Sequence, residues 1–288
     1  MTKVLYSKFL GFVLALSAYF FLVMMDSYAK YLSNYLPIQE IVWGRYFFHL
    51  LLTLLIIFAF KIKVNLKKNF NFQILRSLLM IISTVLMYLS LKFLNITDVY
   101  VIFFLSPFFL VLFSQMYLND RMSFRGKILM FLSFLSVLFA LEVFNKNINI
   151  FFVIPLAMAL TFALYQFFTK KIAKNNEPFT DLFYSGILGG VIFTAVIFLD
   201  GSALSSSYLP QLILLGTLGL VSHLLLILAI KFSNLSLVSN IQYSQLIWAN
   251  VSNVFFFNQE LNSFMIVGSI LIIIFGYLFL KLELKTNQ

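Results

Sequence analysis

The most unusual chemistry in this sequence is a concentration of polar side chains in residues 239–253, inside an otherwise apolar stretch. The segment contains Ser239, Asn240, Gln242, Tyr243, Ser244, Gln245, Trp248, Asn250, Ser252 and Asn253. Amides left unpaired in hydrocarbon cost several kcal/mol each, so these side chains must face protein or water. Polar contacts between helices would satisfy some of them, but their density favours the lining of a cavity. The residues expected to line it are Asn240, Gln242, Tyr243, Trp248 and Asn250.

Asp26 and Arg45 are charged residues that fall inside apolar stretches rather than in the polar segments between them. A charged side chain inside a bilayer costs about 2.5–3.5 kcal/mol on insertion scales, so each calls for a partner. The two lie at similar predicted depths in neighbouring helices, which makes a hydrogen-bonded pair geometrically possible. Two roles stay open at this point: an ion pair that locks two helices together, or a pair that gates a pathway or contacts a substrate.

His49 and His223 both fall near the middle of apolar stretches. His49 follows Arg45 by four residues and therefore shares its helix face. Each histidine could be neutral and satisfied by a neighbouring backbone or hydroxyl group. Each could also relay protons, because the ordinary pKa of histidine lies within the physiological range.

Other chemistries are poorly supported by the residues present. Three further candidates for the cavity lining are His223 and, in the stretch 97–118, Ser106 and Gln115. With no cysteine and no cluster of carboxylates, the sequence predicts neither a metal site nor thiolate chemistry. It also lacks a G-x-x-x-x-G-K-[ST] phosphate loop, so ATP hydrolysis is not expected. Two isolated histidines do not form a cluster of acids and bases, so we expect neither an enzyme nor a cofactor.

The elements that must position these residues are apolar helices. Of the 288 residues, 62% are hydrophobic and 10% are charged, which excludes a soluble globular fold. Because a bilayer core needs about 20 apolar residues per helix, the sequence predicts an all-α membrane protein with ten transmembrane helices. The expected helices are 9–30, 38–60, 71–92, 97–118, 124–144, 149–170, 179–199, 209–230, 236–257 and 263–282.

The distribution of basic residues predicts the orientation of these helices. With the N-terminus in the cytoplasm, the 20 Lys and Arg residues all fall on that side except Lys30, Lys92, Lys146 and Arg45. Since basic residues collect in cytoplasmic loops, both termini are expected in the cytoplasm. The membrane expected for the predicted transporter is a bacterial inner membrane. The same rule explains the net charge of +10 without a nucleic-acid partner.

An internal repeat divides the chain into halves. Residues 91–97 read LKFLNIT and residues 230–236 read IKFSNLS, and other similar pairs follow at nearly the same offset. The predicted repeats are residues 1–145 and 146–288, with five helices each. An odd number of helices forces the second repeat to enter the membrane upside down. Two inverted five-helix repeats are typical of secondary transporters, whose substrate site lies at the repeat interface.

Short motifs over nearly the whole chain resemble the drug/metabolite transporter superfamily, EamA type. They include residues 25–32 (MDSYAKYL), residues 43–46 (WGRY), residues 242–249 (QYSQLIWA) and the acidic residue Glu260. The resemblance implies a cavity surrounded by helices one to four and six to nine, with helices five and ten at the periphery. Relatives often have a proline in the segment that reads SNIQ at 239–242, so no gate based on a proline is expected there.

The function predicted from these features is secondary transport of a small polar organic metabolite across the inner membrane by alternating access. The resemblance implies an amino-acid-like, S-adenosylmethionine-like or vitamin-like solute. Membrane lipid is expected as a further partner. Monomeric and homodimeric states both stay open. The alternative function is that of a membrane-embedded flippase or enzyme that acts on an amphipathic lipid precursor.

Overall fold

The computed structural model describes residues 3–94, 96–118, 120, 122–142, 150–201, 204–257, 260 and 262–285. All regular secondary structure in these residues is helical. Arg121 and Lys146, which were used to predict the topology, lie outside the described residues.

Most helices begin and end close to the boundaries that the hydropathy pattern predicts. The helices are α1 Lys3–Leu32, α2 Ile38–Ala59, α3 Phe70–Phe93, α4 Ile96–Phe103, α5 Ser106–Tyr117, α6 Phe124–Ala140, α7 Val153–Ala173, α8 Pro178–Asp200, α9 Leu209–Phe232, α10 Leu235–Ile241, α11 Gln245–Phe257 and α12 Ser263–Lys285. Short 3-10 turns precede α7 (Ile150–Phe152) and α9 (Ser206–Tyr208), and a third, Gln242–Ser244, joins α10 to α11.

Eight segments in the described residues are long and apolar enough to cross a membrane. They correspond to α1, α2, α3, α4 with α5, α7, α8, α9 and α12. The remaining two predicted helices differ: α6 has 17 residues, and the stretch 236–257 is interrupted by the turn at Gln242–Ser244. The described residues are therefore all-α with eight candidate spans, as in a membrane protein, and the count of ten stays a prediction.

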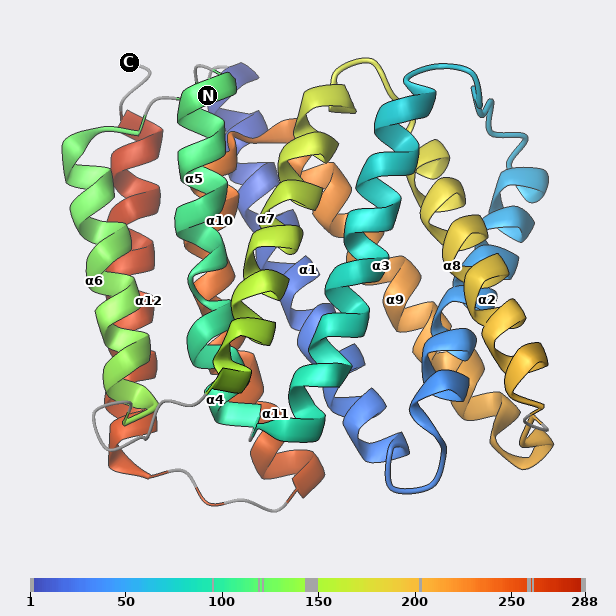
Figure 1. Cartoon of the computed structure of the whole chain (residues 1–288). Helices are drawn as coiled ribbons and strands as arrows, with labels where there is room; N and C mark the ends of the chain where they lie inside the picture. Colours follow the sequence, from blue (N-terminus) through green and yellow to red (C-terminus); the bar gives the residue numbers. More distant parts are fainter. Residues whose placement is uncertain are drawn as a thin grey trace.

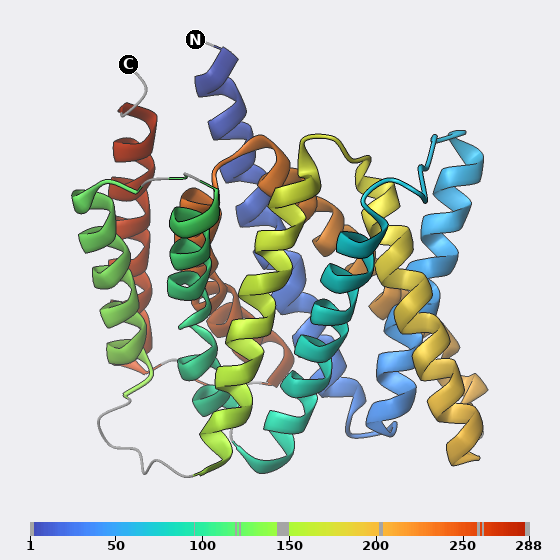
Figure 2. The same cartoon turned by 45° about the horizontal axis from the view of Figure 1, so that its top comes forward.

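The helices lie side by side in one bundle (Figures 1 and 2). α6 and α12 form a pair at one edge of the bundle, and α2 and α8 lie at the opposite edge (Figure 1). The beginning of α1 and the end of α12 lie at the same end of the bundle in both views. We refer to this as the terminal end, and the loops that join α2 to α3 and α7 to α8 also lie there (Figure 1).

Two of the predicted helices are broken, for different physical reasons. α4 ends at Phe103 and α5 begins at Ser106, next to Pro107. Proline lacks a backbone N–H and so cannot continue the hydrogen bonds of the preceding turn. The break between α10 and α11 contains no proline, and a tighter 3-10 turn replaces the α-helical pattern there.

Small residues allow α2 to approach α8 and α9 closely. A Cβ added to Gly189 of α8 would lie 2.3 Å from Cδ1 of Tyr46, and one added to Gly216 of α9 would lie 2.4 Å from Cβ of Phe48. Small residues drive helix association in membranes because they let backbones come together. This packing fixes the position of α2 and of the charged residue Arg45 that it carries.

We predict that Gly189→Ala lowers the melting temperature in detergent and that Gly190→Ala does not. Both changes give the same gain in helix propensity. The methyl group added at Gly189 would meet the Tyr46 ring, whereas the nearest atom to a Cβ at Gly190 is 3.7 Å away. Overpacking of this kind costs about 1–3 kcal/mol. Equal melting temperatures for the two variants would show that the contact between α2 and α8 tolerates separation.

Candidate functional site

A small cavity lies where helices from both halves of the chain converge. Its lining comes from α1, α2, α3, α4, α7, α9 and α11. Its volume of about 60 Å³ leaves room for a few water molecules, so a larger ligand requires the helices to move apart. It is the candidate functional site, because a few polar groups converging among mostly apolar walls between helices are typical of ligand sites.

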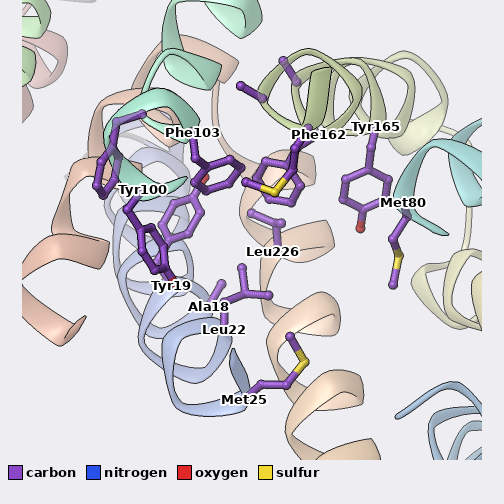
Figure 3. Packing of buried hydrophobic residues seen from close by; sticks show 14 of the residues in the cluster. Ala18, Tyr19, Leu22, Met25, Met80, Tyr100, Phe103, Phe162, Tyr165 and Leu226 are labelled. Atoms are coloured by element: carbon purple, nitrogen blue, oxygen red, sulfur yellow. The ribbon is translucent and has the colours of Figure 1, made fainter. Parts of the chain in front are cut away.

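Aromatic and thioether side chains form most of the walls. Figure 3 shows six of these residues among the buried side chains between the helices: Leu22 and Met25 of α1, Met80 of α3, Tyr100 and Phe103 of α4, and Phe162 of α7. Met87, Tyr88 and Met158 complete this part of the lining. Such walls offer flat rings for stacking and flexible, polarizable thioethers that fit irregular ligands.

The charged residues predicted as a pair, Asp26 and Arg45, both line this cavity. Among the described residues, no ion pair within 4.0 Å joins them, whereas Lys8 and Glu283 form an ion pair at 3.1 Å. Arg45 instead donates from Nη1 to the Thr84 hydroxyl at 3.2 Å and from Nη2 to Nε2 of His223 at 3.0 Å. Asp26 and Arg45 therefore face the same space from two sides without neutralising each other by direct contact.

Several polar atoms in the cavity have no protein partner. They are Nε of Arg45, the hydroxyl of Tyr88 and Oε1 of Gln245. All three are buried, and a buried polar atom without a hydrogen bond costs about 1–3 kcal/mol. Together with the Asp26 carboxylate they provide donors, acceptors and both charges to a ligand in this space.

His223 connects the cavity to a second buried arginine. The guanidinium of Arg45 can only donate, so Nε2 of His223 must accept. A neutral His223 then carries its proton on Nδ1, which lies 3.3 Å from the hydroxyl of Tyr165. That hydroxyl accepts from Nη2 of Arg76 at 3.4 Å. The hydrogen bonds thus run from the cavity through Tyr165 to Arg76 on α3.

Arg76 is completely buried between α3, α7 and α8. It donates from Nη1 to the backbone carbonyl of Asp181 at 2.8 Å and from Nε to the Thr169 hydroxyl at 3.1 Å. The Asp181 carboxylate accepts in turn from the amides of Gln73 and Asn176. These contacts join three helices near the terminal end of the bundle and satisfy a charge that would otherwise be costly to bury.

The polar residues of the predicted helix 236–257, now α10 and α11, lie mostly away from this cavity. Gln245 lines it, whereas Tyr243 lies against the rings of Phe104 and Phe134, and Asn250 donates to the Ser269 hydroxyl at 3.0 Å. The side-chain polar atoms without a protein partner include those of Ser106, Asn240, Gln242, Tyr243 and Trp248. Gln115 is half-buried and lies outside the cavity lining.

The two histidines lie in adjacent positions but differ in their contacts. Their ring centroids are 6.4 Å apart, and His223 lines the cavity while His49 does not. Nε2 of His49 is buried and has no hydrogen-bond partner. The chain of hydrogen bonds described above therefore passes through His223 alone.

Sequence patterns missed several residues of the site. The charge count treats Arg76 as one of the cytoplasmic basic residues, although its side chain is buried. Its place inside the predicted helix 71–92, rather than in the adjoining loop, was the available signal. Tyr88, Tyr100, Phe103 and Phe162 carried no signal, because aromatic residues occur throughout this chain.

Comparison with known protein families finds one family model that matches both halves of the chain. The model of the EamA-like transporter family matches residues 9–141 and again residues 148–281. The chain belongs to the EamA-like transporter family. It is thus an integral membrane protein of the drug/metabolite transporter superfamily, and it is a transporter of a small-molecule solute rather than an enzyme.

Individual relatives agree with this assignment. The transporter is 22% identical over 249 residues to the S-adenosylmethionine uptake transporter of Rickettsia prowazekii, with 86% of this chain and 84% of that protein covered. The protein of the same name in Rickettsia bellii is 25% identical over 257 residues, covering 86% of this chain and 85% of its own. A crystal structure 13% identical in sequence superposes with a TM-score of 0.79 over 96% of this chain and 99% of its own, which shows a shared fold.

We predict that Arg76→Leu lowers the free energy of unfolding by about 3–5 kcal/mol, because it removes the positive partner from a buried polar network. The measurement is thermal unfolding of the purified transporter in detergent. Lys127→Leu is the control, since it also removes one positive charge but at an exposed position. Similar melting temperatures for both variants would show that the network around Arg76 adds nothing to stability.

Proposed function

We propose that this chain is a secondary transporter of a zwitterionic metabolite with an aromatic ring, of the S-adenosylmethionine type. The observation that carries the proposal is the cavity in which Asp26 and Arg45 face the same space between aromatic walls without a direct ion pair. The names of the rickettsial relatives support the same class of solute.

The groups of such a solute match the lining of the cavity. The Asp26 carboxylate offers a partner for an ammonium or sulfonium cation, and the free Nε of Arg45 offers a donor for a carboxylate. The rings of Tyr100, Phe103 and Phe162 provide faces on which a purine can stack. A neutral or purely anionic solute would leave the half-buried carboxylate of Asp26 without a partner, which selects against it.

Alternating access requires that the cavity be closed toward one side of the membrane at a time. The small volume of the cavity fits a closed stage, from which the helices separate to admit a solute. We propose that the network of Arg76 closes it toward the terminal end, because its hydrogen bonds hold α3, α7 and α8 together there. His223 bonds to Arg45 in the cavity and lies beside Tyr165, which contacts Arg76. A solute that draws Arg45 toward its carboxylate would therefore weaken the contact of Arg45 with His223 and loosen this closure.

Several polar residues of α10 and α11 lie outside the cavity, and we propose a role for them in another conformation of the transport cycle. Asn240, Gln242 and Tyr243 are buried at or beside the break in this helix, and their side-chain polar atoms have no protein partner. Broken helices form the moving parts of the site in many secondary transporters. We propose that these side chains contact the solute or water when the two halves rearrange.

The membrane arrangement proposed is ten spans in two inverted repeats, 1–145 and 146–288. The breaks at α4/α5 and α10/α11 fall in the fourth helix of each half, and the family model matches each half separately. Chain ends at the same end of the bundle fit an even number of spans (Figure 1). The basic loops favour a cytoplasmic terminal end in a bacterial inner membrane.

The opposite end of the bundle carries a cluster of tyrosines that fits an outer membrane surface. Tyr31 lies between Tyr28 and Tyr35, with ring centroids 6.2 and 5.4 Å away, and Tyr35 stacks on Tyr208 at 5.9 Å. Tyrosines are enriched where a membrane protein meets the headgroup region. This cluster and the basic terminal end would then lie at the two opposite surfaces of the proposed membrane.

We predict that Asp26→Asn weakens the binding of S-adenosylmethionine about 30-fold or more, since it removes the partner of a desolvated cation. Asp26 makes no hydrogen bond within the described residues, so this nearly isosteric change breaks no internal contact there. Binding is measured as the ligand-dependent rise in melting temperature of purified protein, and transport as uptake of labelled S-adenosylmethionine into proteoliposomes.

Glu177→Gln serves as the matched control, because it also neutralises one carboxylate but at an exposed position outside the cavity. Adenosine, which lacks the amino-acid part, should raise the melting temperature of both variants equally. If lipid precursors stabilise the unaltered protein and no zwitterionic metabolite does, the proposed substrate class is wrong and a flippase is favoured.

The absence of cysteine makes the topology directly testable with single cysteines. We predict that Asn34→Cys in intact cells reacts with a membrane-impermeant maleimide and that Lys63→Cys reacts only after lysis. Both positions are exposed, and they lie at opposite ends of α2. Labelling of Lys63→Cys in intact cells would reverse the proposed orientation.

A further inference from the structure

The outer face of the α6 and α12 pair contains a groove that the transport cavity does not use. It encloses about 420 Å³ and is lined by Arg125, Ile128 and Leu129 from α6 and by Leu278, Lys281 and Lys285 from α12. The two helices run in opposite directions, so the first turns of α6 meet the last turns of α12 (Figures 1 and 2). The groove therefore lies at the terminal end of the bundle, at its edge.

One end of the groove is strongly basic. Lys281 and Lys285 are four residues apart and share one face of α12, and Arg125 faces them from α6. Within the described residues, none of these three side chains makes an ion pair or a hydrogen bond. The acidic residue nearest in sequence, Glu283, is buried and bonds to Lys8 and Asn234 instead.

The rest of the groove is apolar and open to the surroundings of the protein. Ile128 is 43% exposed and Leu278 is 41% exposed, although both are aliphatic. Further along the same helices, Phe131, Leu135 and Ile274 are also exposed. In a membrane protein such a surface faces lipid chains, so the groove continues directly into the hydrocarbon region.

We propose that this groove binds an anionic phospholipid, with its phosphate held by Arg125, Lys281 and Lys285 and its acyl chains lying along Ile128 and Leu278. Arginine binds phosphate oxygens in a bidentate manner and lysine provides point charges for the same group. Basic pockets between transmembrane helices at a membrane surface have the chemistry that anionic headgroups need. The long basic side chains reach the headgroup while their stems cover apolar surface.

Charge argues against a second copy of this chain as the occupant. A symmetric contact through this face would place the three cations against the same three cations of the other copy. Desolvating like charges in this way is unfavourable, whereas a phosphate compensates them. The proposal depends on the chain spanning a membrane and is independent of the identity of the transported solute.

A bound lipid would add to the contact between α6 and α12 at the terminal end of the pair. At the other end of the pair the contact is tight, since a Cβ added to Gly268 would lie 2.4 Å from Cβ of Ala140. At the terminal end the groove separates the outward faces of the helices. The lipid would fill this gap and lengthen the contact between α6 and α12.

The test compares phosphatidylglycerol with phosphatidylcholine of the same acyl chains, added to the purified full-length transporter in detergent. Affinity is obtained from the lipid-dependent rise in melting temperature. The triple variant Arg125→Gln, Lys281→Gln, Lys285→Gln should bind phosphatidylglycerol on the order of 100-fold more weakly than the unaltered protein. The control Lys63→Gln, Lys67→Gln, Lys68→Gln has the same loss of charge in the exposed loop between α2 and α3 and should bind normally.

A second variant, Leu278→Trp, leaves the charges in place and fills the apolar part of the groove. It should also weaken phosphatidylglycerol binding, because the acyl chains lose their contact surface. Equal loss in both triple variants would mean that net charge attracts the lipid without a site, and would overturn the proposal. Unchanged affinity in the groove variants, or equal affinity for phosphatidylcholine, would overturn it as well.

Discussion

The hydrogen bond between Arg45 and His223 is the interaction on which the rest of the site depends. Arg45 comes from α2 and His223 from α9, so a single contact at 3.0 Å joins the two halves of the chain at the cavity. With this contact in place, the guanidinium makes no direct ion pair with Asp26, although both residues line the cavity. Because hydrocarbon offers no hydrogen bonds to either group, moving one of them requires a replacement partner, and a solute carboxylate can be that partner.

The close packing of α2 against α8 and α9 also positions Arg45 for its hydrogen bond to His223. Gly189 and Gly216 let α8 and α9 approach α2 from two sides, which fixes the depth of Arg45. Tyr165 then connects His223 to Arg76, whose bonds hold α3, α7 and α8 together. A change in the cavity thus has a continuous polar route to the terminal end of the bundle.

The periphery of the molecule follows a different rule. α6 and α12 add nothing to the lining of the cavity, and their outward faces carry exposed aliphatic residues. Their basic residues at one end suit an anionic headgroup, so the same Lys and Arg residues that set orientation would also hold a lipid. The proposed transport site in the centre and the proposed lipid groove at the edge are therefore spatially separate.

The sequence alone determined most of the helices and the membrane character, since both follow from the local run of apolar residues. It also singled out Asp26, Arg45 and His223, because ionisable groups are conspicuous in such runs. Only the tertiary structure decided that Arg76 is buried and that the predicted helix 236–257 breaks without a proline. It also decided that Gln245 rather than Asn240 reaches the cavity. These features depend on contacts between residues more than 80 positions apart, such as Arg76 with Tyr165, and local spacing carries no information about them.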